Sequence, residues 1–129
     1  MTLLGVSGQA LVKLMGETPR GPKREGIFAL WLTLRVAEDM LLVPQQTERA
    51  MKRRVAALQQ RLSSLSFPAP LRRALALAIH ELRDPTRERA SVAIQQLVAP
   101  AREALGGEAG DVVARAARMA TQRVRGEPD

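Results

Sequence analysis

The sequence predicts an all-α protein, and three observations lead to this prediction. Apolar residues recur every three or four positions along most of the chain, which is the spacing of one face of an α-helix. No segment alternates apolar and polar residues as a half-buried β-strand does. Short segments rich in proline and glycine separate the helical patterns. We therefore expect a compact bundle of four to five mostly antiparallel helices joined by short loops.

Residues 1–16 predict at most a weak helix. Their apolar side chains follow a helical spacing, but Gly5, Gly8 and Gly16 interrupt it, and each glycine lowers the helix propensity. We expect an N-terminal arm or weak helix at 1–16, loosely attached, followed by an exposed basic Pro/Gly connector at 17–26. The predicted organisation is completed by a single helical bundle domain at 27–125 and a frayed tail at 126–129.

The bundle begins with a helix that we expect to be central. Residues 27–43 are apolar on nearly all faces of a helix, as is usual for a helix surrounded by others, and Arg35 and Asp39 can pair on its one wet edge. Pro44 ends this helix, because the residue before a proline is pushed out of the helical conformation. Thr47 caps the next helix, whose heptad-like apolar seam consists of Met51, Val55, Leu58, Leu62 and Leu65.

Prolines mark the start of the next two helices. Pro70 suits the first turn of a helix, where its missing N–H costs no hydrogen bond. Asp84 followed by Pro85 predicts a second start, with the aspartate as N-cap and the proline at the first helical position. The expected buried residues are Leu71, Leu75, Ala78 and Leu82 in the first of these helices, and Ala90, Ile94, Leu97 and Val98 in the second.

The last part of the bundle contains a break and a final helix. Pro100 falls inside a continuing helical pattern, so we expect a kink or break near Ala99. Gly106 and Gly107 are typical of a C-terminal stop, and Asp111 is placed to cap the last helix. That helix is expected to bury Val113, Ala116, Ala117, Ala120 and Val124.

Composition narrows the functional classes. The chain carries 17 arginines and 3 lysines, and its net charge of +7 favours anionic partners such as nucleic acid, an acidic protein or a lipid surface. The absence of cysteine fits a reducing cytoplasm. The N-terminus lacks the features of a signal peptide, so we expect a cytoplasmic location. The longest apolar run is too short to span a bilayer.

No set of residues resembles a catalytic or metal site. His80 and Asp84 lie one helical turn apart, but a catalytic zinc needs about three protein ligands, and we expect His80 on a solvated face. Glu38 and Asp39 are neighbours that point about 100° apart on a helix, so they cannot act on one substrate atom. The glycine-rich segment 106–110 follows a helix and carries acids, unlike a phosphate-binding loop. We expect no enzyme activity, cofactor, metal or small-molecule substrate.

Arginine-rich helix faces are the strongest functional signal. On the helix capped by Thr47, two arginines project outward and Lys52 stands beside them. On the last helix, a second stripe lies opposite the buried face. Guanidinium groups bind phosphate in a bidentate way, so both faces could follow the backbone of RNA or DNA. The predicted nucleic-acid-binding residues are Arg49, Lys52, Arg53, Arg115, Arg118 and Arg125.

Two considerations limit this prediction. Amphipathic helices need polar residues on their outer face in any case, so the stripes could be only a solvated face. The three aromatic residues, Phe28, Trp31 and Phe67, all look buried in the helical pattern, whereas stacking on aromatic rings is the usual way to grip a single strand. We therefore expect contacts to the backbone without readout of bases.

An excess of apolar residues indicates a protein partner or self-association. A bundle of this size can enclose only one helix that is apolar on nearly all faces, so a flank of the helix at 27–43 could form an interface. Leu77, and Met119 together with Val112, also fall outside a single core. The predicted partner interface is Trp31, Leu77 and Met119.

In size, helical content, basic character and lack of catalytic motifs, the chain resembles the small helical subunits of ribonucleoprotein machines, such as the small subunit of CRISPR effector complexes. This resemblance covers the whole chain and involves no particular motif. It implies an accessory subunit of a multi-component complex that contacts nucleic-acid backbone. The alternative is a protein–protein adaptor or homo-oligomeric assembly protein with no nucleic-acid role.

Overall fold

The computed structural model describes residues 3–42 and 47–126, and within these ranges it contains helices and no strand. The predicted all-α class is confirmed. The prediction of four to five helices is wrong, because there are seven, or six if α5 and α6 are counted as one broken helix. They are α1 (Leu3–Glu17), α2 (Pro22–Leu42), α3 (Glu48–Ser63), α4 (Ala69–Leu82), α5 (Arg87–Gln95), α6 (Val98–Leu105) and α7 (Gly107–Arg125). No helix in the described ranges is both long and apolar enough to cross a membrane.

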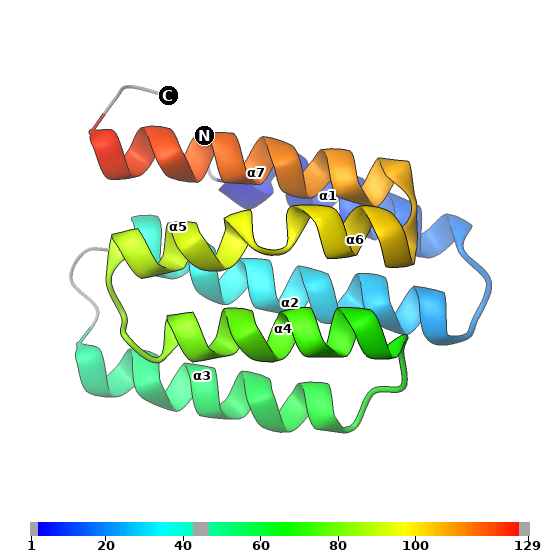
Figure 1. Cartoon of the computed structure of the whole chain (residues 1–129), viewed down its shortest axis with the longest axis horizontal. Coiled ribbons are helices and arrows are strands. Elements are labelled where there is room, and N and C mark those ends of the chain that lie inside the picture. Colours follow the sequence, from blue (N-terminus) through cyan, green and yellow to red (C-terminus); the bar gives the residue numbers. More distant parts are fainter. Residues whose placement is uncertain (1–2, 43–46, 127–129) are drawn as a thin grey trace.

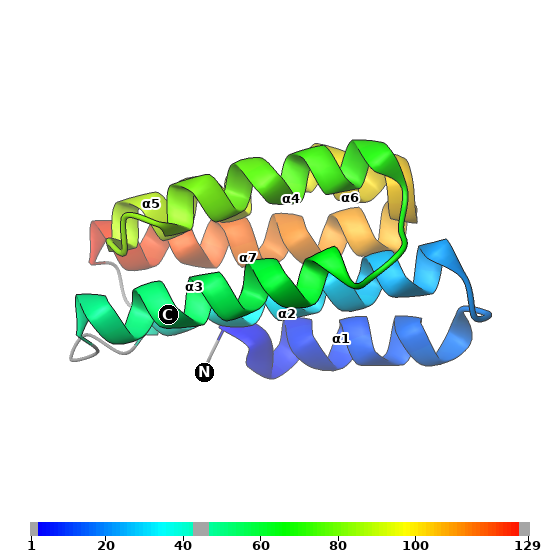
Figure 2. The same cartoon turned by 90° about the horizontal axis from the view of Figure 1, so that it is seen from below.

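Helix α2 is the central helix, as predicted. It contacts all six other helices, which leave only its side between α1 and α3 uncovered (Figures 1 and 2). It begins at Pro22 and not at Ile27, because the proline suits the first turn of a helix and Gly26 packs closely against Leu71 and Leu105. Part of the predicted connector is therefore helical. The predicted end of this helix, at residues 43 and 44, lies outside the described residues.

Helix α1 is packed on the bundle, so the expectation of a loosely attached arm is wrong. It contacts α2 and α7, and Leu11 is fully buried. Leu14 and Met15 are partly buried against the same core. These three residues fall on one face of the helix, and the packing of that face outweighs the cost of the glycines, since tertiary contacts supply most of the stability of a helix in a protein.

Helices α3 and α4 form an antiparallel pair (Figure 1). The hydroxyl of Thr47 caps α3 by accepting a hydrogen bond from the N–H of Ala50 at 3.1 Å. Pro70 lies in the first turn of α4. The predicted inner faces are confirmed except at Leu65, which follows the end of α3 and is partly buried. The buried residues are Met51, Val55, Leu58 and Leu62 on α3, and Leu71, Ala74, Leu75, Ala78, Ile79 and Leu82 on α4.

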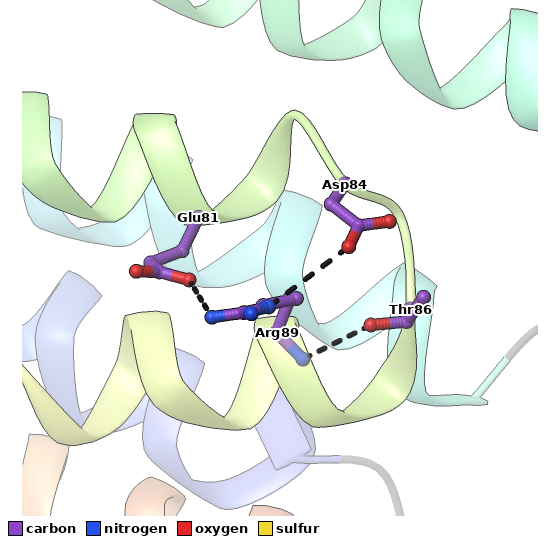
Figure 3. A network of polar contacts seen from close by, with 4 residues as sticks. All are labelled: Glu81, Asp84, Thr86 and Arg89. Carbon is purple, nitrogen blue, oxygen red and sulfur yellow. Dashed lines mark hydrogen bonds and ion pairs between the residues drawn. The ribbon is translucent and has the colours of Figure 1, made fainter.

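The start of α5 lies later than predicted, because Thr86 and not Asp84 is its N-cap. The Thr86 hydroxyl accepts a hydrogen bond from the N–H of Arg89 at 3.2 Å (Figure 3). After Pro85 the chain stays extended for one more residue, with Thr86 at φ −110° and ψ 158°. Threonine is itself a good cap residue, so the helix begins only at Arg87.

The predicted break occurs, but earlier than Ala99. Helix α5 ends at Gln95 and α6 begins at Val98, so Pro100 lies in the first turn of a new helix. A proline has no N–H to donate to the carbonyl four residues before it, and the first turn is where a helix tolerates this loss.

Helix α7 begins at Gly107, so the prediction that Asp111 caps it is wrong. Gly106 has a φ of 102°, a conformation that favours glycine, and it lets the chain turn directly from α6 into α7. A Cβ atom at Gly110 would lie 2.6 Å from Cβ of Arg102, so a glycine at this position permits the close approach of α6 and α7. The expected inner face is buried at Val113, Ala116, Ala117 and Ala120, and Val124 is partly buried. Of the predicted tail, 127–129 lie outside the described residues.

Candidate nucleic-acid interface

The predicted basic stripe on α3 is exposed to solvent. Arg49 and Arg53 form no hydrogen bond or ion pair with any described residue. Nζ of Lys52 lies 2.9 Å from Oε1 of Glu48, one helical turn away on the same helix. The hydrogen bond that Lys52 donates to Glu48, together with the negative charge of that carboxylate, raises the pKa of Lys52 above its usual value. The two arginines therefore offer free charge, whereas Lys52 is largely neutralised by its neighbour.

The predicted stripe on α7 is also exposed. It consists of Arg115, Arg118 and Arg125. Arg118 and Arg125 border an open cavity of about 520 Å³ near the end of α5. There Gln95 donates hydrogen bonds to the carbonyl of Ala117 at 2.9 Å and to the hydroxyl of Thr121 at 2.7 Å, which ties α7 to α5. Asp111 pairs with Arg102 of α6 at 3.1 Å.

The two stripes lie at opposite edges of the bundle. In Figure 1, α3 is the lowest helix and α7 the highest, and the helices α2, α4 and α5 lie between them. A short straight segment of nucleic acid therefore cannot lie along both stripes at once.

A second set of basic residues lines a groove between α3 and α4. This α3–α4 groove has a volume of about 790 Å³. Its floor is apolar and includes Leu62, Phe67, Leu75 and Ile79. Its basic side chains all come from α4 and the residue after it, and they are Arg72, Arg73, His80 and Arg83.

Neighbouring groups hold two of these arginines without neutralising them. The guanidinium of Arg72 lies 4.3 Å from the centre of the Phe67 ring and donates a hydrogen bond to the carbonyl of Leu65. Arg83 donates a hydrogen bond to the side-chain carbonyl of Gln59 at 3.0 Å. Since rings, carbonyls and amides carry no net charge, the groove keeps the positive charge of both residues.

Two acids, Glu81 near the end of α4 and Asp84 just after it, lie beside Arg89 of α5 (Figure 3). Nη1 of Arg89 lies 3.0 Å from Oε2 of Glu81, and its Nε lies 3.9 Å from Oδ2 of Asp84. Arg89 therefore offsets one of these two negative charges. Among the described residues that line the α3–α4 groove, none is acidic.

The sequence-based prediction missed the basic residues of α4. Arg73, His80 and Arg83 follow helical spacing opposite the buried Leu71 and Leu75, so a signal was present in the sequence. It resembled an ordinary solvated face, because the pattern of one helix does not reveal which helix packs beside it.

The aromatic residues are less buried than predicted. Phe67 is buried, but Phe28 and Trp31 are only half-buried. Their ring planes lie 17° apart and their centroids 6.1 Å apart. The guanidinium of Arg35 lies 4.8 Å from the Trp31 ring, and that of Arg61 lies 5.5 Å from the Phe28 ring. The side of α2 that no helix covers accounts for this exposure.

The expected pair of Arg35 and Asp39 does not form. Asp39 accepts a hydrogen bond from Arg54 of α3 instead. An i, i+4 pair within one helix is weak, so a partner on a neighbouring helix can replace it. Arg35 is then free to lie over Trp31.

The three predicted interface residues lie on three different helices. Leu77 on α4 is 60% exposed, which confirms that it falls outside the core, and it borders the α3–α4 groove. Trp31 on α2 and Met119 on α7 are half-buried. Val112 is buried, so its predicted place outside the core is wrong. The prediction assumed that the N-terminal arm is loosely attached, whereas α1 packs on α7.

Metal ligands do not cluster in the described ranges: no three His, Cys, Asp or Glu side chains lie close enough to hold an ion. His80 is exposed, as predicted, and Asp84 faces Arg89. Comparison of the chain with protein-family models, with curated proteins and with solved structures found no match.

Proposed function

We propose that the protein is a non-enzymatic accessory subunit that binds the backbone of RNA or DNA through the outer surface of α3 and α4. The observation that carries this proposal is the α3–α4 groove, along which four basic side chains are arranged without an acidic residue in the described lining. Arg49 and Arg53 extend the basic surface over the outer side of α3.

The spacing of the arginines suits a phosphate backbone. A helix rises about 1.5 Å per residue, so Arg73 and Arg83 are separated by about 15 Å along the axis of α4. Phosphates of one strand of a duplex follow each other at about 3.4 Å along its axis, so the groove could face several of them. Arg72 and Arg83 are already held by Phe67 and Gln59, which lowers the entropy that their side chains lose on binding.

The stripe on α7 is the smaller part of the proposal. It is a single row of arginines on one helix, and it lies at the other edge of the bundle (Figure 1). It can contact a second segment of nucleic acid that wraps around the protein or belongs to another molecule. Two separate basic surfaces fit a subunit that is embedded in a larger nucleoprotein assembly.

Fluorescence anisotropy with labelled single- and double-stranded RNA and DNA tests the proposal. We expect binding that weakens steeply as salt rises, because each neutralised phosphate releases counterions. The double variant Arg73→Gln, Arg83→Gln removes two of the proposed phosphate-binding groups. We expect each removal to weaken binding on the order of tenfold at about 50 mM salt and to lower the salt slope by about one unit.

A control of equal charge is the double variant Lys13→Gln, Lys23→Gln. These two lysines are exposed on α1 and at the start of α2, outside both basic surfaces. We expect a much smaller loss of affinity. If this control loses as much as the groove variant, or if the parent protein binds no nucleic acid at about 50 mM salt, the proposal is wrong.

One observation favours the second candidate, a protein–protein adaptor or homo-oligomer. Leu77 is 60% exposed beside the groove, and a partner could cover it. Such association would depend on protein concentration and little on salt, because an apolar contact is not screened. Light scattering at two salt concentrations distinguishes this behaviour from nucleic-acid binding.

A further inference from the structure

One side of α2 carries two aromatic rings at the surface of the protein. No helix lies over the side of α2 between α1 and α3 (Figure 2), where Phe28 and Trp31 are half-buried. Their rings are nearly parallel, with an angle of 17° between the planes. Two partly exposed rings side by side on one face of a helix offer apolar area that a ligand can cover, so this pair is a candidate binding surface.

We propose that this surface, the α2 platform (Phe28, Trp31, Arg35 and Arg61), stacks the bases of single-stranded nucleic acid. The inference rests on the proposed function, because nucleic acid must bind the protein for a base to reach the rings. Arg35 lies over Trp31 at 4.8 Å and Arg61 over Phe28 at 5.5 Å. Neither arginine has an acidic partner among the described residues.

A base can take the place of these guanidinium groups. A cation–π contact at an exposed site is weak, whereas a base stacked on an aromatic side chain contributes more. The displaced Arg35 or Arg61 would still be near the strand, where it can form a bidentate pair with a phosphate. The platform would thus exchange an internal contact for a stacked base and an ion pair.

The groove on the α3 side of the platform is basic. It has a volume of about 410 Å³, and Arg35, Arg54 and Arg61 are its charged lining residues. Asp39, the acid beside it, is already paired with Arg54. A polyanion that leaves the platform in this direction therefore meets no unpaired carboxylate in the groove lining.

The cavity on the α1 side of the platform is basic as well. It has a volume of about 380 Å³ next to Phe28, and Arg20 and Arg24 line it. The acid of this cavity, Glu25, accepts a hydrogen bond from the N–H of Ser66 at 3.3 Å. Cations thus flank the rings on both sides, which complements the charge of a nucleic-acid strand.

The platform selects single strands because only their bases are accessible. In a duplex the bases are paired and stacked on one another, and a protein ring cannot reach their faces without pulling a base out of the helix. Backbone binding at the α3–α4 groove makes no such distinction. The two surfaces therefore predict different behaviour toward single and double strands.

The fluorescence of Trp31 tests the inference directly. Trp31 is the single tryptophan and the chain has no tyrosine, so the emission of the full-length protein reports on this ring alone. We expect unlabelled oligothymidylate to quench the emission, while a duplex of the same length binds without quenching. Anisotropy of labelled strands measures the affinity for both in parallel.

Phe28→Leu keeps an apolar side chain but removes a stacking ring. We expect it to weaken single-strand binding by about fivefold or more and to leave duplex affinity unchanged. Circular dichroism checks that this variant is folded. If it is not, Arg35→Gln on the exposed edge of α2 takes its place, with the same expected preference for weakening single-strand binding.

Three outcomes overturn the platform. The first is that Trp31 emission stays constant although anisotropy shows that oligothymidylate is bound. The second is that the duplex quenches Trp31 emission as strongly as oligothymidylate does. The third is that the folded variant binds single strands with the affinity of the parent protein. In each of these cases nucleic acid still binds, so the proposed function stands and the uncovered side of α2 is better explained as a protein interface. If neither strand type binds, the proposed function and the platform both fall.

Discussion

The arginines of α3 and α4 differ from those of α7 in what surrounds them. Arg73 and Arg83 border a groove of about 790 Å³ between two helices, with an apolar floor and no acid in its described lining. Arg115 and Arg118 lie on a single helix at the opposite edge of the bundle (Figure 1). The sequence predicts the arginine-rich outer faces of α3 and α7 but not the basic residues of α4, which the packing of α3 beside α4 brings into one groove.

This difference shows that a row of cations becomes a binding surface through its neighbours. In the groove, Phe67, Gln59 and Leu65 fix two arginines in place, and Arg89 offsets one of the two nearby negative charges (Figure 3). Preorganised charges lose less entropy on binding than mobile ones. Arg115 and Arg118 have no such contact among the described residues, so we expect these two arginines to contribute less to binding.

The largest expected effect concerns the floor of the groove. Leu75 is 1% exposed, and Leu75→Ala should lower the free energy of unfolding by about 2–5 kcal/mol, because it leaves a cavity in the core. Leu77 lies two residues further along the same helix and is exposed. Leu77→Ala should therefore change the free energy of unfolding by under about 0.5 kcal/mol. Urea denaturation measures both. Equal losses would show that the groove is not built on the core as described.

The next largest effect compares the two arginine pairs directly. Two double variants each remove two positive charges from exposed positions. The first is Arg73→Gln with Arg83→Gln, and the second is Arg115→Gln with Arg118→Gln. We expect the first pair to lower affinity for a labelled duplex more than the second and to reduce the salt slope by up to about two units. Anisotropy titrations at two salt concentrations provide both values. The reverse order would move the main binding surface to α7.

The helices that could be predicted are those whose own periodicity is complete. The seam from Met51 to Leu62 identifies the buried face of α3 without any knowledge of its partners, and the apolar character of α2 identifies it as central. Helix α1 could not be predicted as a packed helix, because its glycines lower its propensity and the compensating contacts of Leu11, Leu14 and Met15 with the core are tertiary. Asp84 and Thr86 are both good cap residues for α5, and local sequence does not choose between them.

The candidate site is less predictable than the fold. Exposure of Arg49, Arg53, Arg115 and Arg118 follows from helical spacing alone, and the structure agrees. The groove depends on which helices are neighbours, and the exposure of Trp31 depends on which side of α2 stays uncovered. Both are properties of the assembled bundle, so the spacing within one helix could not reveal them.

The smallest effect separates two neighbouring cations on α3. Arg53 has no partner among the described residues, whereas Lys52 pairs with Glu48 at 2.9 Å. Arg53→Gln should lower the salt slope by about one unit, and Lys52→Gln should lower it by less, because Glu48 already offsets the charge of Lys52. The double variant Lys52→Gln, Glu48→Gln removes both charges and should bind like the parent. If Lys52→Gln weakens binding as much as Arg53→Gln, the local pairing of charges does not matter, and only the total charge of the protein attracts nucleic acid.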